Sequence, residues 1–468
     1  SRGMAREEKS KRQKSLDDPA DVISDLPRNV IDSIVECLPL RDAARLSVLS
    51  RKWRDIWISM PYLTFNAYFF ASVLQEKIHV THEFSGIVSK ILFHHKGPIL
   101  KFSLYVPRLG LRPDVVQWIS FLSTSGVKEF NLENQYKMPL QLSSDLFSFV
   151  GLEKLKLHFC VFSPLPNLTC FKRLVSLVLY YVKFREGTFE DLINRCPLLE
   201  ELTLVKCLGI EHVNVNAPDL KHLIVDGTFR SICVKIAGNL VTAGIVLDKL
   251  TKICHKTSLR DLIESLAKSN KLEKLCLGGH FCKVLFNDCS IATMFDKLRC
   301  LELQSICLDN LDLFSSAVHA VEKCPSLQYL VISVNTSSNL DIQVLDYNPD
   351  ITLHHLRHAR VGISRASSTE LKLIEFLLAC SPVLEVLSLS FLKHIKGSSQ
   401  SRMSNQLIRF RRASPKVEVI CPDPIISIES SDSGSNSDSS SGSSGSSDAS
   451  SSSDSDSSES SDSDYIVL

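Results

Sequence analysis

Hydrophobic positions recur along the central part of the chain in a short pattern, L-x-x-L-x-L, and polar or turn residues follow each copy. Eight copies begin at Leu152, Leu174, Leu199, Leu220, Leu272, Leu298, Leu327 and Leu384. Successive copies start 21 to 29 residues apart, except across two gaps of 52 and 57 residues, and a degenerate copy at Leu240 divides the first gap. A repeat of this length indicates one structural unit per copy.

The last three positions of each copy, L-x-L, alternate as a strand does, so both leucines point to one side. A single copy cannot bury its own apolar face, whereas stacked copies form a continuous core with a parallel sheet on a concave surface. The pattern therefore predicts an α/β leucine-rich-repeat solenoid of irregular period. Residues between and after the strand leucines face out of the concave sheet, and we predict a partner-binding face there that includes Lys156, Val178, Thr203, Cys276 and Glu302.

Three copies share a preface in which a helical stretch ends in cysteine shortly before proline, at Cys196, Cys324 and Cys380. Because these cysteines hold the same phase of different repeats, we expect them to stack along the solenoid as core residues. Their spacings of 128 and 56 residues match no metal-ligand motif. We therefore predict neither a metal site nor a nucleophile at these positions.

A different apolar pattern precedes the repeats and predicts three short helices. In the third of them, Trp53, Ile56 and Trp57 fall at i, i+3 and i+4 and share one helix face, while charged residues turn outward. So small a helical unit buries too little apolar surface to be stable by itself. We expect its apolar stripe to be completed by other contacts.

These N-terminal residues resemble the F-box of plant F-box proteins: "LP" at Leu26 and Pro27, "LPLRDAARLSVLSRKWRDIW" from Leu38 to Trp57, and "P-x-L-x-F" from Pro61. The resemblance implies docking on a Skp1-type adaptor and, through it, on a cullin-RING ubiquitin ligase, with the repeats holding a protein substrate. It also implies the residues that face the adaptor or support the interface: Leu26, Pro27, Ile31, Ile34, Leu38, Leu40, Val48, Trp53 and Trp57.

Near the C-terminus, residues His355 to Phe391 resemble the FBD region of plant F-box proteins with leucine-rich repeats, in the order strand, loop, long helix, strand. The expected organisation is a disordered basic N-terminus (1–20), an F-box (21–66), a repeat solenoid (67–350), an FBD-like α/β region (351–424) and a disordered acidic, serine-rich tail (425–468). The tail is too polar to offset the entropy of ordering.

Charge and cysteine content narrow the function classes. The chain has 53 basic and 52 acidic residues, which argues against nucleic acid or a membrane surface as the partner of the whole chain. The N-terminus has no apolar segment typical of a signal peptide, and no apolar run is long enough to span a membrane. We expect a nuclear or cytoplasmic protein whose fifteen cysteines stay reduced.

Motifs of catalysis are missing from the sequence: there is no P-loop, no G-x-S-x-G, no H-E-x-x-H and no paired C-x-x-C. We predict a non-catalytic protein without cofactor or metal, acting as the substrate-recognition subunit of a Skp1-cullin-F-box ubiquitin ligase. The alternative is a leucine-rich-repeat scaffold that works independently of a ligase.

Overall fold

The computed structural model describes residues 23, 26–49, 51–74, 80–107, 115–163, 171–235, 238–247, 256–278, 281, 295–306, 311–334, 351–391 and 403–421. The chain divides into two units, residues Ser1–Pro422 and Asp423–Leu468, and every described residue belongs to the first. The basic N-terminus and the serine-rich tail predicted from the sequence both lie outside the described residues.

One sheet of fourteen strands organises the described part of the first unit, and every strand pairing in it is parallel. Its strands, in spatial order, are β1 (Tyr62–Phe65), β2 (Lys101–Val106), β3 (Glu129–Asn134), β5 (Lys154–His158), β7 (Ser176–Tyr180), β9 (Glu201–Val205), β11 (His222–Gly227), β13 (Thr242–Leu247), β14 (Lys274–Gly278), β15 (Cys300–Ile306), β16 (Tyr329–Val334), β17 (His358–Ile363), β18 (Val386–Phe391) and β19 (Glu418–Ile420). The spatial order follows the chain, as stacked repeats require.

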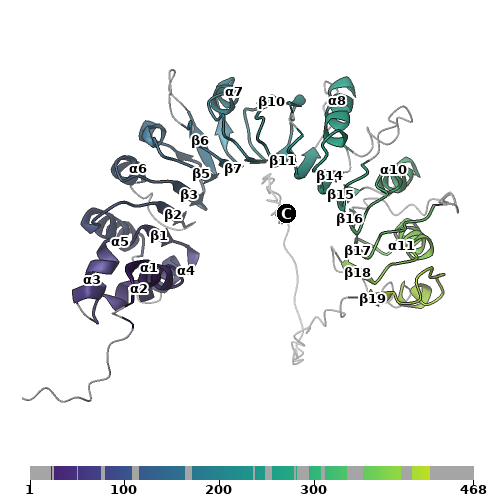
Figure 1. Cartoon of the computed structure of the whole chain (residues 1–468), viewed down its shortest axis with the longest axis horizontal. Coiled ribbons are helices and arrows are strands. Elements are labelled where there is room, and N and C mark those ends of the chain that lie inside the picture. The colour runs from purple at the N-terminus through teal and green to yellow at the C-terminus, as the bar shows by residue number, and fades with distance from the viewer. Residues whose placement is uncertain are drawn as a thin grey trace, which may run out of the picture. The chain divides into compact units, whose positions relative to one another are not determined.

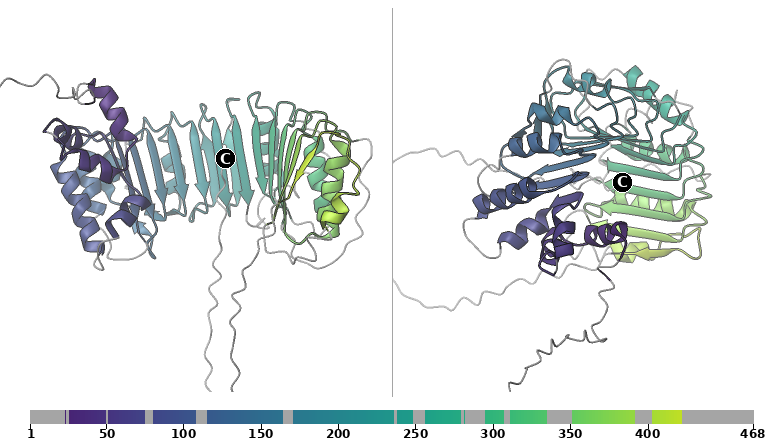
Figure 2. Two further views of the ribbon diagram at one scale, coloured as in Figure 1. Left: turned by 90° about the horizontal axis from the view of Figure 1, so that it is seen from below. Right: turned by 60° about the vertical axis from the view of Figure 1, so that its left-hand side comes forward.

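The sheet is curved, with its strands along the inner side and the helices on the outer side (Figure 1). The helical elements after the N-terminal helices are α4 (Ala67–Leu74), α5 (Val80–His94), α6 (Val115–Ser123), η1 (Ser144–Ser148), α7 (Thr188–Ile193), α8 (Lys256–Ala267), α10 (Leu311–Glu322) and α11 (Ser368–Cys380). Of those labelled in Figure 1, α5, α6, α7, α8, α10 and α11 lie on the outer side. Two small parallel sheets accompany them: β4 (Leu140–Gln141), β6 (Cys160–Phe162) and β8 (Lys183–Phe184), and β10 (His212–Asn216) with β12 (Ser231–Lys235). Seen from below, the strands of the large sheet lie side by side in one row (Figure 2).

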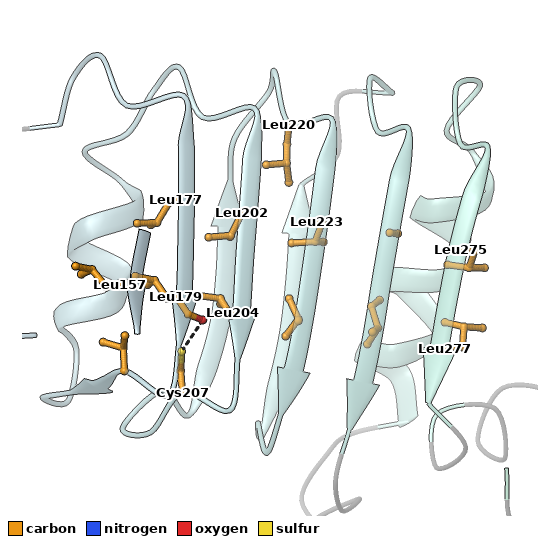
Figure 3. Packing of buried hydrophobic residues seen from close by; sticks show 14 of the residues in the cluster. Leu157, Leu177, Leu179, Leu202, Leu204, Cys207, Leu220, Leu223, Leu275 and Leu277 are labelled. Atoms are coloured by element: carbon orange, nitrogen blue, oxygen red, sulfur yellow. Dashed lines mark hydrogen bonds between the residues drawn. The ribbon is translucent and has the colours of Figure 1, made fainter. Parts of the chain in front are cut away.

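The strand leucines form the core, and the predicted solenoid is confirmed. Leu155, Leu177 and Leu202 are in register on adjacent strands, and each is at most 1% exposed. Figure 3 shows the side chains of Leu177 and Leu202 in one row across adjacent strands, with those of Leu179 and Leu204 in the next row. Burying one such side chain stabilises the fold by about 1.5 to 3 kcal/mol.

Three strands precede the first copy found in the sequence. In β2 and β3 the place of the first strand leucine is taken by Phe102 and Phe130, which are buried and stacked with ring centroids 5.9 Å apart. In β1 the corresponding residues are Leu63 and Phe65, also buried. The repeat therefore begins at β1, because the core requires apolar volume at these positions and not leucine itself.

The repeated cysteines are core residues, as predicted. Cys196, Cys324 and Cys380 are 1%, 3% and 5% exposed. The thiols of Cys196 and Cys324 donate to the carbonyl oxygens of the residues four positions earlier, at 3.2 and 3.3 Å. Burial raises the pKa of Cys324 to about 12, so its thiol stays protonated at neutral pH.

The three short helices expected at the N-terminus are α1 (Arg28–Glu36), α2 (Leu40–Leu46) and α3 (Arg51–Ile58). Trp53 and Ile56 of α3 are buried in a core cluster that continues into the sheet. The backbone of Lys96 donates to the carbonyl of Ile58 at 2.6 Å, and that of Leu100 donates to the carbonyl of Pro61 at 2.8 Å. The helical unit is therefore joined directly to the start of the sheet.

The C-terminal segment has the expected order of strand β17, helix α11 and strand β18. A capping box starts α11: the Ser367 hydroxyl accepts from the Glu370 amide at 3.3 Å, and the Glu370 carboxylate accepts from the Ser367 amide at 2.7 Å. The same carboxylate, which is fully buried, also accepts from the amide of Ser364 at 2.7 Å. These bonds fix the loop between β17 and α11.

Candidate interaction surfaces

Helix α1 separates its apolar residues into two faces. Ile31 and Val35 are 1% and 2% exposed and belong to the core. Val30 and Ile34, each 38% exposed, lie four residues apart on the outer face together with the exposed Pro27. We call Pro27, Val30 and Ile34 the α1 surface.

The structure divides the residues predicted to serve the adaptor interface into three groups. Pro27, Ile34 and Val48 are exposed, whereas Leu26, Leu38 and Trp57 are half-buried and pack against the core. Ile31, Leu40 and Trp53 are buried. A buried side chain shapes the surface above it and does not itself touch a partner docked on the folded unit, so these three can act only as supporting residues there. Adaptor contact by the others remains a prediction.

Three further apolar residues of this unit are exposed and were missed by the sequence prediction of the site. Val30 is one of them, and Ile23 and Leu49 are 57% and 69% exposed. The helical period carried a signal for Val30, since Pro27, Val30 and Ile34 fall at i, i+3 and i+7 on one face. Polar contacts border this face, because Arg28 pairs with Asp32 at 2.8 Å.

The five residues of the predicted partner-binding face lie in a single row across the sheet. The strand registers align Lys156 with Val178 and Thr203, and Cys276 with Glu302. Ile224 and Gly244 connect the two groups. We call this line of aligned positions, which runs from Asn131 on β3 to Ser388 on β18, the concave row.

Exposure differs along the concave row, and two of the expected contact residues are corrected. Lys156 is exposed, and Val178 and Glu302 are half-buried. Thr203 and Cys276 are 3% and 0% exposed, so the expectation that they face a partner is wrong. Side chains converge on the inner side of a curved sheet, and these short side chains end below the level that a partner reaches.

The N-terminal end of the concave face is rich in charged and aromatic groups. The Lys156 ammonium lies 5.5 Å from the centroid of the Tyr180 ring, which is within the range of a cation–π contact. Glu129 pairs with Lys154 at 2.8 Å and with Lys101 at 3.3 Å. Partial burial alone would raise the pKa of the Glu129 carboxyl, but the hydrogen bonds and charges of the two lysines outweigh it and hold the pKa below its ordinary value.

The C-terminal end of the concave face carries a cluster that sequence reasoning missed. Tyr329 on β16 and His358 on β17 stack with centroids 4.9 Å apart and an interplanar angle of 7°. Tyr329 is 47% exposed, and Arg360, two residues after His358, is also exposed. Tyr329 holds the variable position of "LQYLVI" that faces the concave side, so the signal was present in the repeat itself.

A polar cavity of about 360 Å³ lies where strands β14 to β17 begin. Lys271, Lys297, Arg299 and His355 line it together with Glu273 and Asp296.

In the described ranges, no group of three histidine, cysteine or carboxylate residues is placed to hold a metal ion. Nor does any helix in them combine the length and apolar composition needed to cross a membrane.

Known proteins share both halves of this architecture. The F-box domain model matches residues 23–65, and the model of the LRR repeats of FBD-associated F-box protein At5g56370 matches residues 115–260. F-box/FBD/LRR-repeat protein At1g13570 of Arabidopsis thaliana is 30% identical over 416 residues, covering 86% of this chain and 98% of the relative. The chain belongs to the F-box/FBD/LRR-repeat family.

Other matches of this F-box/FBD/LRR-repeat protein agree. FBD-associated F-box protein At1g66310 of Arabidopsis thaliana is 25% identical over 461 residues, covering 88% of the chain and 98% of the relative. Among solved structures, that of Leptospira interrogans LRR protein LIC12759 is similar at 14% identity with a TM-score of 0.28, covering 68% of this chain and 82% of that chain. The F-box match includes α1, α2, α3 and β1, so it ends together with the first strand of the sheet.

Proposed function

We propose that this F-box/FBD/LRR-repeat protein is the substrate-recognition subunit of a Skp1-cullin-F-box ubiquitin ligase. The observation that supports the proposal best is the α1 surface. In an F-box of three short helices, Val30 and Ile34 remain exposed beside Pro27, although the same helix buries Ile31 and Val35. An exposed apolar face on an otherwise well-packed unit is typical of a protein–protein interface.

The proposed work of the chain is to bring molecules together. The adaptor holds the F-box, the concave sheet holds a protein substrate, and the ubiquitin-loaded carrier enzyme is thereby kept near lysines of the substrate. Holding both reactants in one complex raises their effective concentration, to about the millimolar range for short flexible links. On this proposal no residue of the chain makes or breaks a covalent bond.

Copurification tests the proposal. The chain is co-expressed with a Skp1-type adaptor and purified, and we expect a stoichiometric complex. The double variant Val30→Glu and Ile34→Glu is expected to lose the adaptor, because it places two charges in an apolar interface. Val150→Glu is the matched control, since Val150 is 84% exposed and lies outside the F-box. A wild-type chain that does not retain the adaptor, when another F-box protein does, would contradict the proposal.

A ligase-independent scaffold is the second candidate, and one observation favours it. The backbone bonds from Lys96 to Ile58 and from Leu100 to Pro61 join the helical unit to the sheet, as a stabilising cap would be joined. The two functions predict different results for the Val30 and Ile34 double variant. If the α1 surface binds the adaptor, the double variant loses the adaptor while the melting temperature of the chain changes little. If the chain is a scaffold, the double variant keeps its binding partner.

A further inference from the structure

Strands β16 to β19 present a mixed apolar and cationic surface on the concave side. It consists of Tyr329 and Val331 on β16, His358 and Arg360 on β17, Ser388 on β18 and Ile420 on β19, which we call the β16–β19 patch. The registers align Val331, Arg360 and Ser388 in the concave row and extend this line to Ile420, and they align Tyr329 with His358, each two residues before Val331 and Arg360. Tyr329 and Ile420 are 47% and 46% exposed.

Arg360 is the charged centre of this patch. Its side chain is exposed and makes no ion pair or hydrogen bond with any described residue, and its neighbours in the row, Val331 and Ser388, are uncharged. The next carboxylate along the row is that of Glu302, two strands away, which accepts a hydrogen bond from the Gln304 amide at 2.7 Å. The Arg360 guanidinium is therefore available to an external anion.

Arg357 shows the opposite arrangement three residues earlier. Arg357 is also exposed, but its guanidinium pairs with the Glu385 carboxylate at 3.3 Å. The two arginines differ mainly in whether the protein supplies the carboxylate. This makes Arg357 a matched control for the removal of a positive charge.

The aromatic stack supplies the apolar part of a contact. Tyr329 and His358 lie parallel, with 7° between their planes, so their rings stack face to face and hold each other in place, and Tyr329 remains 47% exposed. Tyrosine and arginine are the residue types that most often dominate the energy of protein interfaces, and they do so where they meet an apolar neighbour. Val331 is such a neighbour beside Arg360, and Ile420 lies on the other side of it, beyond Ser388.

We propose that the β16–β19 patch binds a segment of the substrate in which an aspartate or glutamate lies next to a large apolar side chain. This inference rests on the proposed function, because it names the substrate chemistry of the concave face. A guanidinium offers two parallel N–H donors that match a carboxylate. A phosphate group is ordinarily recognised by clusters of arginine, and the patch has a single one.

Fluorescence anisotropy with labelled peptides tests the inference on the full-length chain in complex with its Skp1-type adaptor. The probes are a positional-scanning library of twelve-residue peptides that fix a central phenylalanine and vary its neighbour among Glu, Asp, Gln, Lys and phosphoserine. We expect peptides with Glu or Asp to bind about tenfold more tightly than those with Lys, a ratio typical of one hydrogen-bonded charge pair. Arg360→Glu is expected to reverse this preference.

Two further variants separate charge recognition from apolar contact. Arg357→Gln is expected to keep the preference for Glu and Asp, and Tyr329→Ala is expected to weaken all peptides while keeping their order. Binding without charge preference, a preference that survives Arg360→Glu, selection of phosphoserine over Glu and Asp, or no binding at all would overturn the inference. Adaptor copurification is measured on the same samples, so loss of the ligase function is recognised separately from failure of the patch.

Discussion

The F-box helices and the strands of the sheet reach stability in different ways. Helices α1 and α2 are nine and seven residues long, and they begin after Pro27 and Pro39 without a side-chain cap. Each inner strand of the sheet is flanked by a repeat on both sides, and leucines such as Leu177 and Leu202 are fully buried. The apolar side chains of the strands are buried by the neighbouring repeats of the same chain, whereas the α1 surface still exposes two aliphatic side chains.

This difference indicates where a bound partner can add most to the stability of the chain. Short, uncapped helices gain little from local interactions and depend on tertiary contacts for most of their stability. A contact made on α1 therefore adds a large share of the stability of its helix. A contact made on the concave sheet adds little stability, because the core beneath it is already buried. Such a contact mainly determines which partner binds.

Truncating a core leucine should produce the largest effect. Leu202→Ala is expected to lower the free energy of unfolding by about 2 to 5 kcal/mol, because the two neighbouring repeats cannot collapse into the cavity. Urea denaturation followed by circular dichroism measures the change. Val48→Ala, at a side chain that is 83% exposed, is expected to stay within about 0.5 kcal/mol of the wild type. If both variants lost the same free energy of unfolding, the sheet core and the F-box surface would not differ in the way described.

Adaptor binding should protect the F-box helices selectively. At an adaptor concentration one hundred times Kd, binding adds about 2.7 kcal/mol to the stability of those segments that can open only after the adaptor dissociates. We expect amide hydrogen exchange in α1, α2 and α3 to slow by about one hundredfold, while exchange in β7, β9 and β11 stays unchanged. Hydrogen exchange with mass spectrometry measures both. Protection of the central strands alone would place the adaptor elsewhere.

Removing the cap of α11 tests the value of local stabilisation. Ser367→Ala should reduce stability by about 1 kcal/mol, since it deletes the hydroxyl that accepts from the Glu370 amide. Ser265→Ala is the matched control inside α8, where the same chemical change is expected to alter stability by less than about 0.5 kcal/mol. Thermal melting of both variants gives the comparison, and similar shifts would mean that the capping box contributes nothing.

The smallest effect is expected at the ion pairs of the sheet. The pKa of Glu129 is lower in the folded protein than its ordinary value, so its stabilisation is present above the unfolded pKa and disappears as pH falls through the folded pKa. Glu129→Gln should reduce stability at pH 7 by at most about 1 kcal/mol, because the pair is partly exposed. The difference from the wild type should vanish in acid. Urea titrations at several pH values measure it, and a difference that does not shrink as the pH is lowered would contradict the assignment.

Periodicity alone was sufficient to predict the central strands. The leucine copies from Leu152 onward each start just before one strand of the sheet, and the degenerate copy at Leu240 starts just before β13. The strands β1, β2 and β3 were missed, because phenylalanine replaces leucine in the pattern. The core selects for shape and volume, and several apolar residues satisfy that requirement.

Surface residues were harder to predict. Strand alternation placed all five expected contact positions in one row, yet it could not show that Thr203 and Cys276 are buried. Their burial depends on the curvature of the sheet and on the length of neighbouring side chains, which belong to other repeats. The stack of Tyr329 on His358 joins residues 29 positions apart, and only the register of β16 with β17 reveals it.

Strand β1 has a mechanical consequence. It is the last part of the F-box match and also the first strand of the sheet, paired along Tyr62 to Phe65 with β2. In the described residues, the F-box match passes into the sheet without an intervening linker, so under the proposed function the sheet would hold a bound substrate at a set distance from the adaptor. Under the same proposal, the substrate lysines at that distance would be modified first, and adding or deleting one repeat would change which lysines those are.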